Sequence, residues 1–217
     1  MMNRRDFSTR LGAAGLALAT ADLAQAQDAP VEGRHYVRLS QPAPVSLPSP
    51  DKKVEVVEFF WYECPHCNAF EPTLEAWAAK LPADVAFRRV PVGFTARHQF
   101  AQKLFYALEE TGQIETMHAR IYAAVHVQGQ RLTSESAVFK VVESLGGDMA
   151  KFTEAYRGFS VNTKSARARQ LSDAYKIDGV PAIGVHGRYY TSATLTGSFQ
   201  NTLAVTDFLI NRVRKGV

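Results

Sequence analysis

The chain contains two cysteines, and both lie in one four-residue segment, Cys64-Pro65-His66-Cys67. Sulfurs three residues apart can close a small disulfide, and a cysteine at the start of a helix can also form a reactive thiolate. Such a pair can alternatively be a static structural disulfide or half of a zinc site. Zinc usually takes four ligands, and the chain has no second cysteine pair. The spacing therefore favours thiol chemistry over metal binding.

A strand and a helix must position these sulfurs. Residues 54–61 are mainly apolar and predict a buried strand, and a helical pattern follows over residues 65–80. Cys64 then stands at the helix start, where unpaired backbone N–H groups and the helix dipole favour its thiolate. These positions predict an exposed nucleophile at Cys64 and a buried resolving thiol at Cys67, with His66 able to donate a hydrogen bond or positive charge to the Cys64 sulfur.

Two acidic residues lie close to the motif. Glu58 is inside the predicted strand, where burial would raise the pKa of its carboxyl and let it accept or deliver the proton of the buried thiol. The alternative is an ion-paired structural acid. Arg88 and Arg89 on the neighbouring strand are candidate partners, but the pleat direction leaves the choice between them open. Glu63 directly precedes the first cysteine, and its negative charge is predicted to oppose thiolate formation.

The rest of the chain predicts an α/β domain with a helical insertion. Residues 85–92 alternate as a second strand, so strand, helix and strand form a βαβ unit. The apolar period then becomes helical over residues 96–176, with four helices and a fifth starting near Asn162. Strand patterns return at residues 181–185 and 189–191, and a final helix is predicted over residues 201–214. A short strand candidate at residues 35–39 precedes all of these elements.

The N-terminus has the order of an export signal. Arg4 and Arg5 precede a mildly apolar stretch at residues 11–21 and a small-residue end, Ala24-Gln25-Ala26. The stretch is too short for a membrane span of about 20 residues. The paired arginines resemble a twin-arginine signal, and an ordinary secretory signal is the alternative. The predicted division is a cleaved signal peptide over 1–26, one domain over 27–95 and 177–217, and an inserted helical domain over 96–176.

Composition restricts the class of partner. The formal net charge is only +4 for 217 residues, and 46% of the residues are hydrophobic. Nucleic-acid-binding domains usually cluster many more basic residues on one face. Composition therefore predicts a globular protein that binds no nucleic acid. Without a second cysteine pair we expect no metal site, and we expect no cofactor and take a monomer as the default.

A family resemblance rests on residues 58–67, Glu-Phe-Phe-Trp-Tyr-Glu-Cys-Pro-His-Cys, together with the distant pair Val180-Pro181. The chain resembles the DsbA-type disulfide oxidoreductases. The resemblance implies a thioredoxin fold with an inserted all-helical domain and a location in the periplasm. It also implies a cis peptide bond before Pro181, opposite the cysteines, which would leave backbone groups of Val180 free to pair with an extended client.

The expected function is oxidation of cysteine pairs in exported, folding proteins, in which the Cys64–Cys67 disulfide is donated to the client. The resemblance implies reoxidation by a quinone-linked membrane partner of the DsbB type. A disulfide reductase or isomerase would run the same exchange with a less oxidising pair. A peptide-binding chaperone or a copper carrier would use the thiols without exchanging them.

Overall fold

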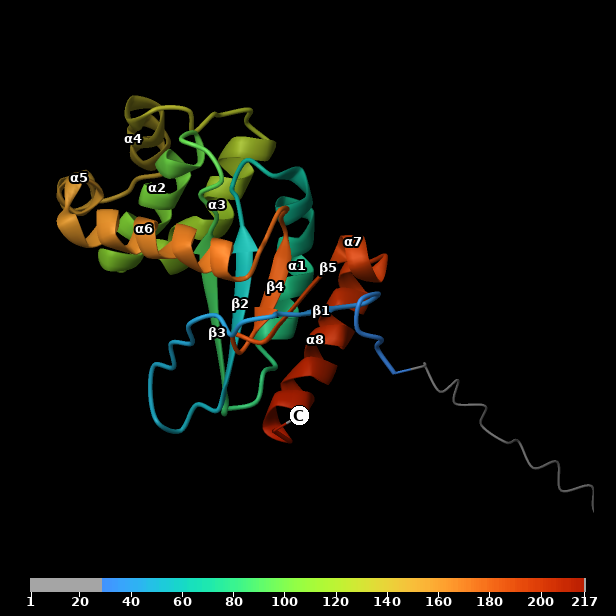
Figure 1. The fold of residues 1–217 in the computed structure, drawn as a ribbon. Helices are drawn as coiled ribbons and strands as arrows, with labels where there is room; N and C mark the ends of the chain where they lie inside the picture. Colours follow the sequence, from blue (N-terminus) through green and yellow to red (C-terminus); the bar gives the residue numbers. More distant parts are fainter. Residues whose placement is uncertain (1–28, 217) are drawn as a thin grey trace, which may run out of the picture.

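A computed structural model describes residues 29–216, which form a five-stranded sheet covered by helices (Figure 1). The strand order is β1-β5-β4-β2-β3. β2 is parallel to β3 and antiparallel to β4, while β5 is antiparallel to β4 and β1. The strands are β1 (Val37–Arg38), β2 (Val54–Phe60), β3 (Val85–Pro91), β4 (Ala182–Val185) and β5 (Tyr189–Ser192).

The central strand β2 is buried along its whole length because both of its faces are covered. Val54 and Val56 pack on one face with α1 (Pro65–Ala78) and α8 (Phe199–Arg214). Val57 and Phe59 point the other way, into a core shared with the inserted helices. Successive side chains of a strand alternate between faces, so a mainly apolar strand suits a sheet covered on both sides.

Five helices lie between β3 and β4 in the chain and gather at one end of the sheet, away from α8 (Figure 1). This arrangement confirms the predicted thioredoxin fold with a helical insertion. The fifth helix begins three residues before Asn162, because Gly158 ends one helix and caps the next. The five are α2 (His98–Glu110), α3 (Ile114–His126), α4 (Glu135–Ser144), α5 (Met149–Arg157) and α6 (Phe159–Ala174).

The termini of the fold differ from prediction in three places. The first strand is only the two-residue β1, and the last helix begins at Phe199, where Ser198 accepts a hydrogen bond from the Asn201 N–H at 3.1 Å. A four-residue helix, α7 (Ala193–Thr196), was not predicted because one turn is too short to show a helical period. The signal peptide predicted over 1–26 lies outside the described residues.

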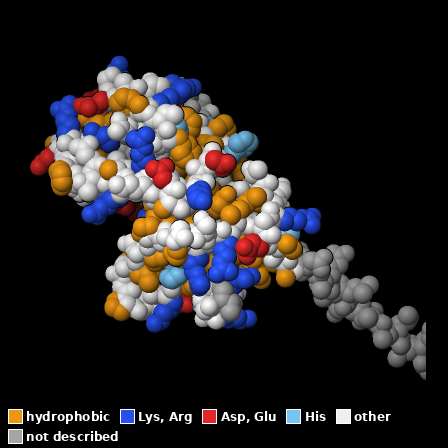
Figure 2. Space-filling model, viewed as in Figure 1, with side chains coloured by type: hydrophobic (Ala, Val, Ile, Leu, Met, Phe, Trp, Pro, Cys, Tyr) orange, Lys and Arg blue, Asp and Glu red, His pale blue; other side chains and the backbone are white. Residues whose placement is uncertain are grey.

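Charges on the surface are mixed. Lys and Arg side chains alternate with Asp and Glu over the visible face, and hydrophobic side chains are scattered between them (Figure 2). Within residues 29–216, no helix is both long enough and apolar enough to cross a bilayer.

Candidate active site

Cys64 and Cys67 lie where β2 gives way to α1, and both are free thiols. Cys64 is the N-cap of α1, with φ −86° and ψ 117°. Pro65 occupies the first turn, where the N–H that proline lacks would have no helical partner. Cys67 follows within the first turn. The predicted helix-start position of Cys64 is therefore confirmed.

The exposure predicted for Cys64 is wrong, since the residue is only 7% exposed and Cys67 is fully buried. The loop that carries Val180 lies against the first sulfur, and the Cys64 thiol donates a hydrogen bond to the Val180 carbonyl at 3.5 Å. The Val180-Pro181 peptide bond is cis, as predicted. Because β4 begins only at Ala182, Val180 lies beyond the end of the sheet, beside the sulfur.

The pKa values of the two cysteine thiols are shifted in opposite directions. The pKa of Cys64 is lowered to about 6, chiefly because the Cys67 thiol hydrogen-bonds its sulfur. Backbone N–H groups of Cys67 and His66 and the charge of His66 act in the same direction, against the effect of burial. The pKa of Cys67 is raised well above its ordinary value by burial first, then by Cys64 and by the nearby charge of Glu58. At neutral pH the site favours a thiolate at Cys64 and a thiol at Cys67.

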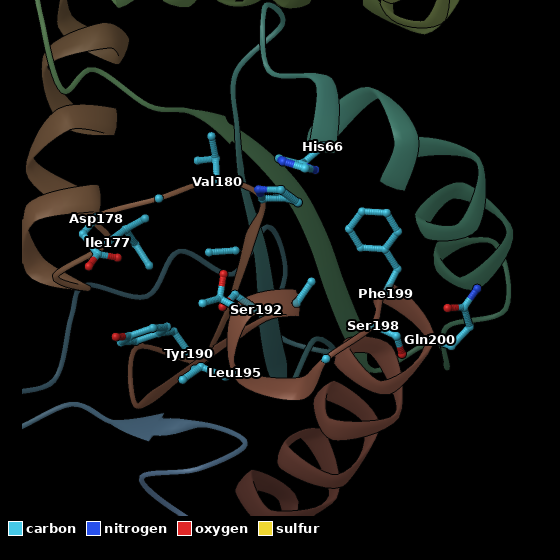
Figure 3. Close-up of a pocket in the computed structure, with 16 residues that line it drawn as sticks. His66, Ile177, Asp178, Val180, Tyr190, Ser192, Leu195, Ser198, Phe199 and Gln200 are labelled. Atoms are coloured by element: carbon cyan, nitrogen blue, oxygen red, sulfur yellow. The ribbon is translucent and has the colours of Figure 1, made fainter.

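A groove of about 630 Å³ opens beside the cysteines, with His66 at the start of α1 and Phe199 at the start of α8 on one side and the segment of Ile177 to Val180 on the other (Figure 3). His66 is exposed, and Phe199 is held by stacking on Phe70, with ring centroids 4.8 Å apart. The groove is more apolar than polar. Besides these two residues its lining includes Val180, Pro181, Tyr190 and Leu195.

The cation that faces Glu58 is Arg89 and not Arg88. In the register of β2 and β3, Glu58 is opposite Arg89, whose Nε lies 3.1 Å from Glu58 Oε2. Arg88 points to the other face of the sheet and pairs with Glu55 at 2.9 Å. Glu55 is as fully buried as Glu58, so the strand carries two buried acids on opposite faces, each next to an arginine.

Arg89 is shared by three carboxylates. Its Nη2 lies 2.6 Å from Glu71 Oε1 and also contacts Glu75. Cys67, Glu71 and Glu75 recur every four residues, so they follow one another down one face of α1. Burial, together with the charge of Glu71, raises the pKa of Glu58 to about 8 despite the opposing effect of Arg89. Most Glu58 side chains are therefore protonated at neutral pH.

Helix α3 supports the site through two histidines. His118 Nδ1 lies 2.7 Å from the Tyr62 hydroxyl, and His118 Nε2 lies 3.4 Å from Glu71 Oε1. Burial opposes ionisation of Glu71, but contact with His118 lowers the pKa of its carboxyl overall. His126 Nε2 lies 2.8 Å from the Tyr62 carbonyl oxygen. The inserted helices thus hold the chain just before the cysteine motif.

Glu63 is not a free charge beside Cys64. Its side chain is 4% exposed and forms ion pairs with Arg97 and Arg131. Sequence reasoning missed both arginines, since they come from distant parts of the chain. It also missed Glu71, although a residue four positions after Cys67 in a helix must share its face.

Metal-binding clusters of three or more His, Cys, Asp or Glu side chains do not occur within residues 29–216. The remaining histidines contact the protein. His98 Nδ1 lies 2.8 Å from the Thr95 hydroxyl, and His186 Nδ1 accepts a hydrogen bond from the Glu55 N–H at 3.3 Å. The expected absence of a metal and a cofactor stays a prediction.

Known proteins share this sequence and fold. The family model of the DSBA-like thioredoxin domain matches residues 55–204. The thiol:disulfide interchange protein DsbA of Burkholderia cepacia is 42% identical over 209 residues, which cover 96% of both chains. The crystal structure of Pseudomonas aeruginosa DsbA superposes with a TM-score of 0.81 at 37% identity, covering 86% of this chain and 96% of that one.

A relative from Azotobacter vinelandii, also a thiol:disulfide interchange protein DsbA, is 41% identical over 84% of each chain. The matched segment contains both cysteines and the cis-proline loop. The chain therefore belongs to the DSBA-like thioredoxin family and is a thiol:disulfide oxidoreductase of the DsbA type, a protein-disulfide oxidase.

Proposed function

We propose that the oxidised Cys64–Cys67 pair accepts a client thiolate at Cys64. The client sulfur bonds to Cys64 Sγ, the Cys64–Cys67 bond breaks, and its electron pair goes to Cys67 Sγ, which takes up a proton. A second client thiolate then attacks the client sulfur of the mixed disulfide. The client leaves with a new disulfide, and Cys64 leaves as a thiolate. The observation that carries this assignment is the opposite acidity of the two sulfurs.

The direction of electron flow follows from the Cys64 thiolate. A low pKa makes Cys64 a good leaving group and stabilises the dithiol form relative to the disulfide. A stabilised reduced form makes the disulfide a strong oxidant, a rule for which DsbA is itself the standard example. This supports donation of the disulfide to clients over the reverse reaction.

Glu58 is the proposed proton donor to Cys67. A carboxyl with a pKa of about 8 is mostly protonated at neutral pH, and Glu58 is close enough to Cys67 that its ionised form raises the pKa of that thiol. When Cys67 leaves as a thiolate, it can take the Glu58 proton, and reoxidation returns that proton. The ion pair with Arg89 is also compatible with a structural acid, so this role needs a kinetic test.

Clients are proposed to bind beside the cis-proline loop. Val180 is next to the Cys64 sulfur and outside the β4 ladder, which supports pairing with an extended client backbone. The neighbouring groove offers apolar contacts to client side chains. Backbone pairing with a mainly apolar groove suits many sequences, as expected for folding proteins with free cysteines.

The location and the partner in reoxidation are also proposals. The export signal predicted at residues 1–26 and the family support a protein that works in the periplasm, where disulfides persist, and its monomeric state stays a prediction. Reoxidation is assigned to a quinone-linked membrane oxidase of the DsbB type. This partner must attack the same two sulfurs, because the chain has only two cysteines.

Two measurements test the function. Equilibration of the purified protein with glutathione should leave the pair reduced except under oxidising mixtures, as thiol counting would show; a pair that stays oxidised in strongly reducing mixtures would contradict the oxidase. Cys67→Ser should accumulate mixed disulfides between Cys64 and clients, while Cys64→Ser should not. Absence of such adducts from Cys67→Ser would favour a chaperone or copper carrier.

A further inference from the structure

Glu63 creates an electrostatic problem next to the reacting sulfur. It directly precedes Cys64, and its side chain is 96% buried, so water screens its charge poorly. A negative charge close to a thiol favours the protonated form and would raise the pKa of Cys64. Yet the pKa of Cys64 is lowered. Glu63 is not among the main causes that shift this pKa, and the cations around its carboxylate account for that.

Each carboxylate oxygen of Glu63 contacts its own guanidinium. Arg131 Nε lies 2.9 Å from Oε1, and Arg97 donates to Oε2 from Nη2 at 3.1 Å and from Nε at 3.3 Å. The Leu132 N–H donates to Oε1 at 3.4 Å. One anion thus meets two cations, and arginine stays charged at any physiological pH. The three side chains have a net charge of +1.

Both arginines come from outside the segment that carries the cysteines. Arg97 is the residue before α2 and also lies over the Trp61 ring, 5.5 Å from its centroid. Arg131 lies in the connection between α3 and α4. Their side chains are 45% and 62% exposed, so each can be replaced without opening the core.

We propose that Arg97 and Arg131 are positioning residues for disulfide exchange. They hold the Glu63 carboxylate against the inserted helices and leave a net positive charge beside Cys64, which stabilises its thiolate and makes the disulfide more oxidising. This inference rests on the role proposed above for Cys64, and it gives the inserted helices a direct part in setting the redox balance.

Other charged groups also act near the Cys64 sulfur. On α1 the His66 imidazole and the Cys67 thiol act on this sulfur, and Asp178 lines the groove across from His66 (Figure 3). His98 of α2 packs on Trp61, with ring centroids 4.6 Å apart. Of these groups, His98 senses the cluster directly: burial lowers the pKa of its imidazole, the charge of Arg97 lowers it further, and Glu63 raises it. Variants of Glu63, Arg97 and Arg131 therefore measure the effect of the cluster together with the change that it causes at His98.

Four proteins provide the test: the wild type, Glu63→Gln, the double variant Arg97→Gln/Arg131→Gln, and the triple variant. The measured quantity is the pKa of Cys64 in the reduced protein, from the pH dependence of alkylation at Cys64 mapped by mass spectrometry. The nominal charge beside Cys64 is +2 in Glu63→Gln, +1 in the wild type, 0 in the triple variant and −1 in the double variant. Arg157→Gln, which breaks an exposed ion pair with Glu135, is the matched control.

The expected order of Cys64 pKa is Glu63→Gln lowest, then the wild type, the triple variant, and the double variant highest. The step from wild type to double variant should be about one pKa unit, a roughly tenfold change in the acid dissociation constant of the Cys64 thiol. Arg157→Gln should leave the pKa unchanged. An unchanged or lower pKa in the double variant, with the fold intact by circular dichroism, would overturn the proposal. Because alkylation needs no client, this result is independent of whether Cys67→Ser traps clients.

Discussion

Two buried carboxylates flank the cysteine motif, and their surroundings are opposite. Glu58 shares the single guanidinium of Arg89 with two further carboxylates, so its cluster is short of positive charge. Glu63 has two guanidiniums to itself, so its cluster has positive charge in excess. Glu58 lies near Cys67, and Glu63 precedes Cys64.

This difference shows how one short motif can hold two unlike sulfurs. Burial and the charge of Glu71, which Arg89 offsets only in part, raise the pKa of Glu58, and burial together with Cys64 and Glu58 raises the pKa of Cys67. An excess of cations beside the other acid is compatible with a thiolate at Cys64. The helix start favours the first cysteine in any case. In the proposal made above, the surrounding ion pairs add to an asymmetry that the Cys67 hydrogen bond and the helix start already create.

The largest effect is expected from Glu58→Gln, which removes the proposed proton donor. In single turnovers with a peptide client, release of Cys67 should slow on the order of 10²-fold. The wild-type rate, corrected for the client thiolate fraction, should fall as the pH rises through about 8, because Glu58 then loses the proton that it donates. This fall should be missing in Glu58→Gln.

Glu55→Gln is the matched control for that experiment. Glu55 is equally buried on the opposite face of β2 and pairs with Arg88. Its loss should lower stability without changing the pH profile. A Glu58→Gln protein that keeps the fall near pH 8, or a Glu55→Gln protein that loses it, would contradict the comparison.

A smaller effect is expected from His66→Gln. The substitution removes the imidazole charge near Cys64 but keeps the backbone N–H that reaches its sulfur. The pKa of Cys64 should rise, and the glutathione equilibrium should shift toward the disulfide by roughly three- to tenfold. Because His66 is exposed, the free energy of unfolding should change by less than about 0.5 kcal/mol. An unchanged glutathione equilibrium would show that His66 does not stabilise the Cys64 thiolate.

The smallest effect is expected from Glu75→Gln. Glu75 also contacts Arg89, but its side chain is 57% exposed, so solvent screens its charge. The turnover rate should change by less than about twofold. An effect as large as that of Glu58→Gln would mean that the exposed Glu75 matters as much as the buried Glu58. The charge balance proposed for the three carboxylates around Arg89 would then be wrong.

Sequence patterns predicted the local features of the site well. The buried strand, the cysteine at the helix start and the helices of the insertion follow from apolar periodicity, which acts within one element. The cis bond at Pro181 came from the family resemblance and not from a pattern. The partner of Glu58 stayed open because the choice between Arg88 and Arg89 depends on which face each strand residue takes, and only strand register decides that.

The features that were missed depend on contacts between distant segments. Arg97 and Arg131 reach Glu63 from connections beside the inserted helices, and no local pattern marks them as partners. The prediction that Glu63 opposes the Cys64 thiolate was based only on its position next to Cys64 in the sequence. Cys64 is less exposed than expected because a loop from the far end of the chain covers it. Phe199 was missed as a lining residue of the groove because it lies at the start of α8, far along the chain from the cysteines.

The central claim, that the two sulfurs differ strongly in acidity, is tested most directly by titrating the thiolates of the reduced protein. Absorbance of the thiolate between pH 4 and 10, with brief alkylation at pH 7 to identify the reactive residue, measures both sulfurs at once. The account predicts one thiolate at Cys64 with a midpoint near 6, while Cys67 stays protonated beyond the ordinary cysteine value of about 8.5. Two midpoints together near about 8.5, or first alkylation at Cys67, would contradict it.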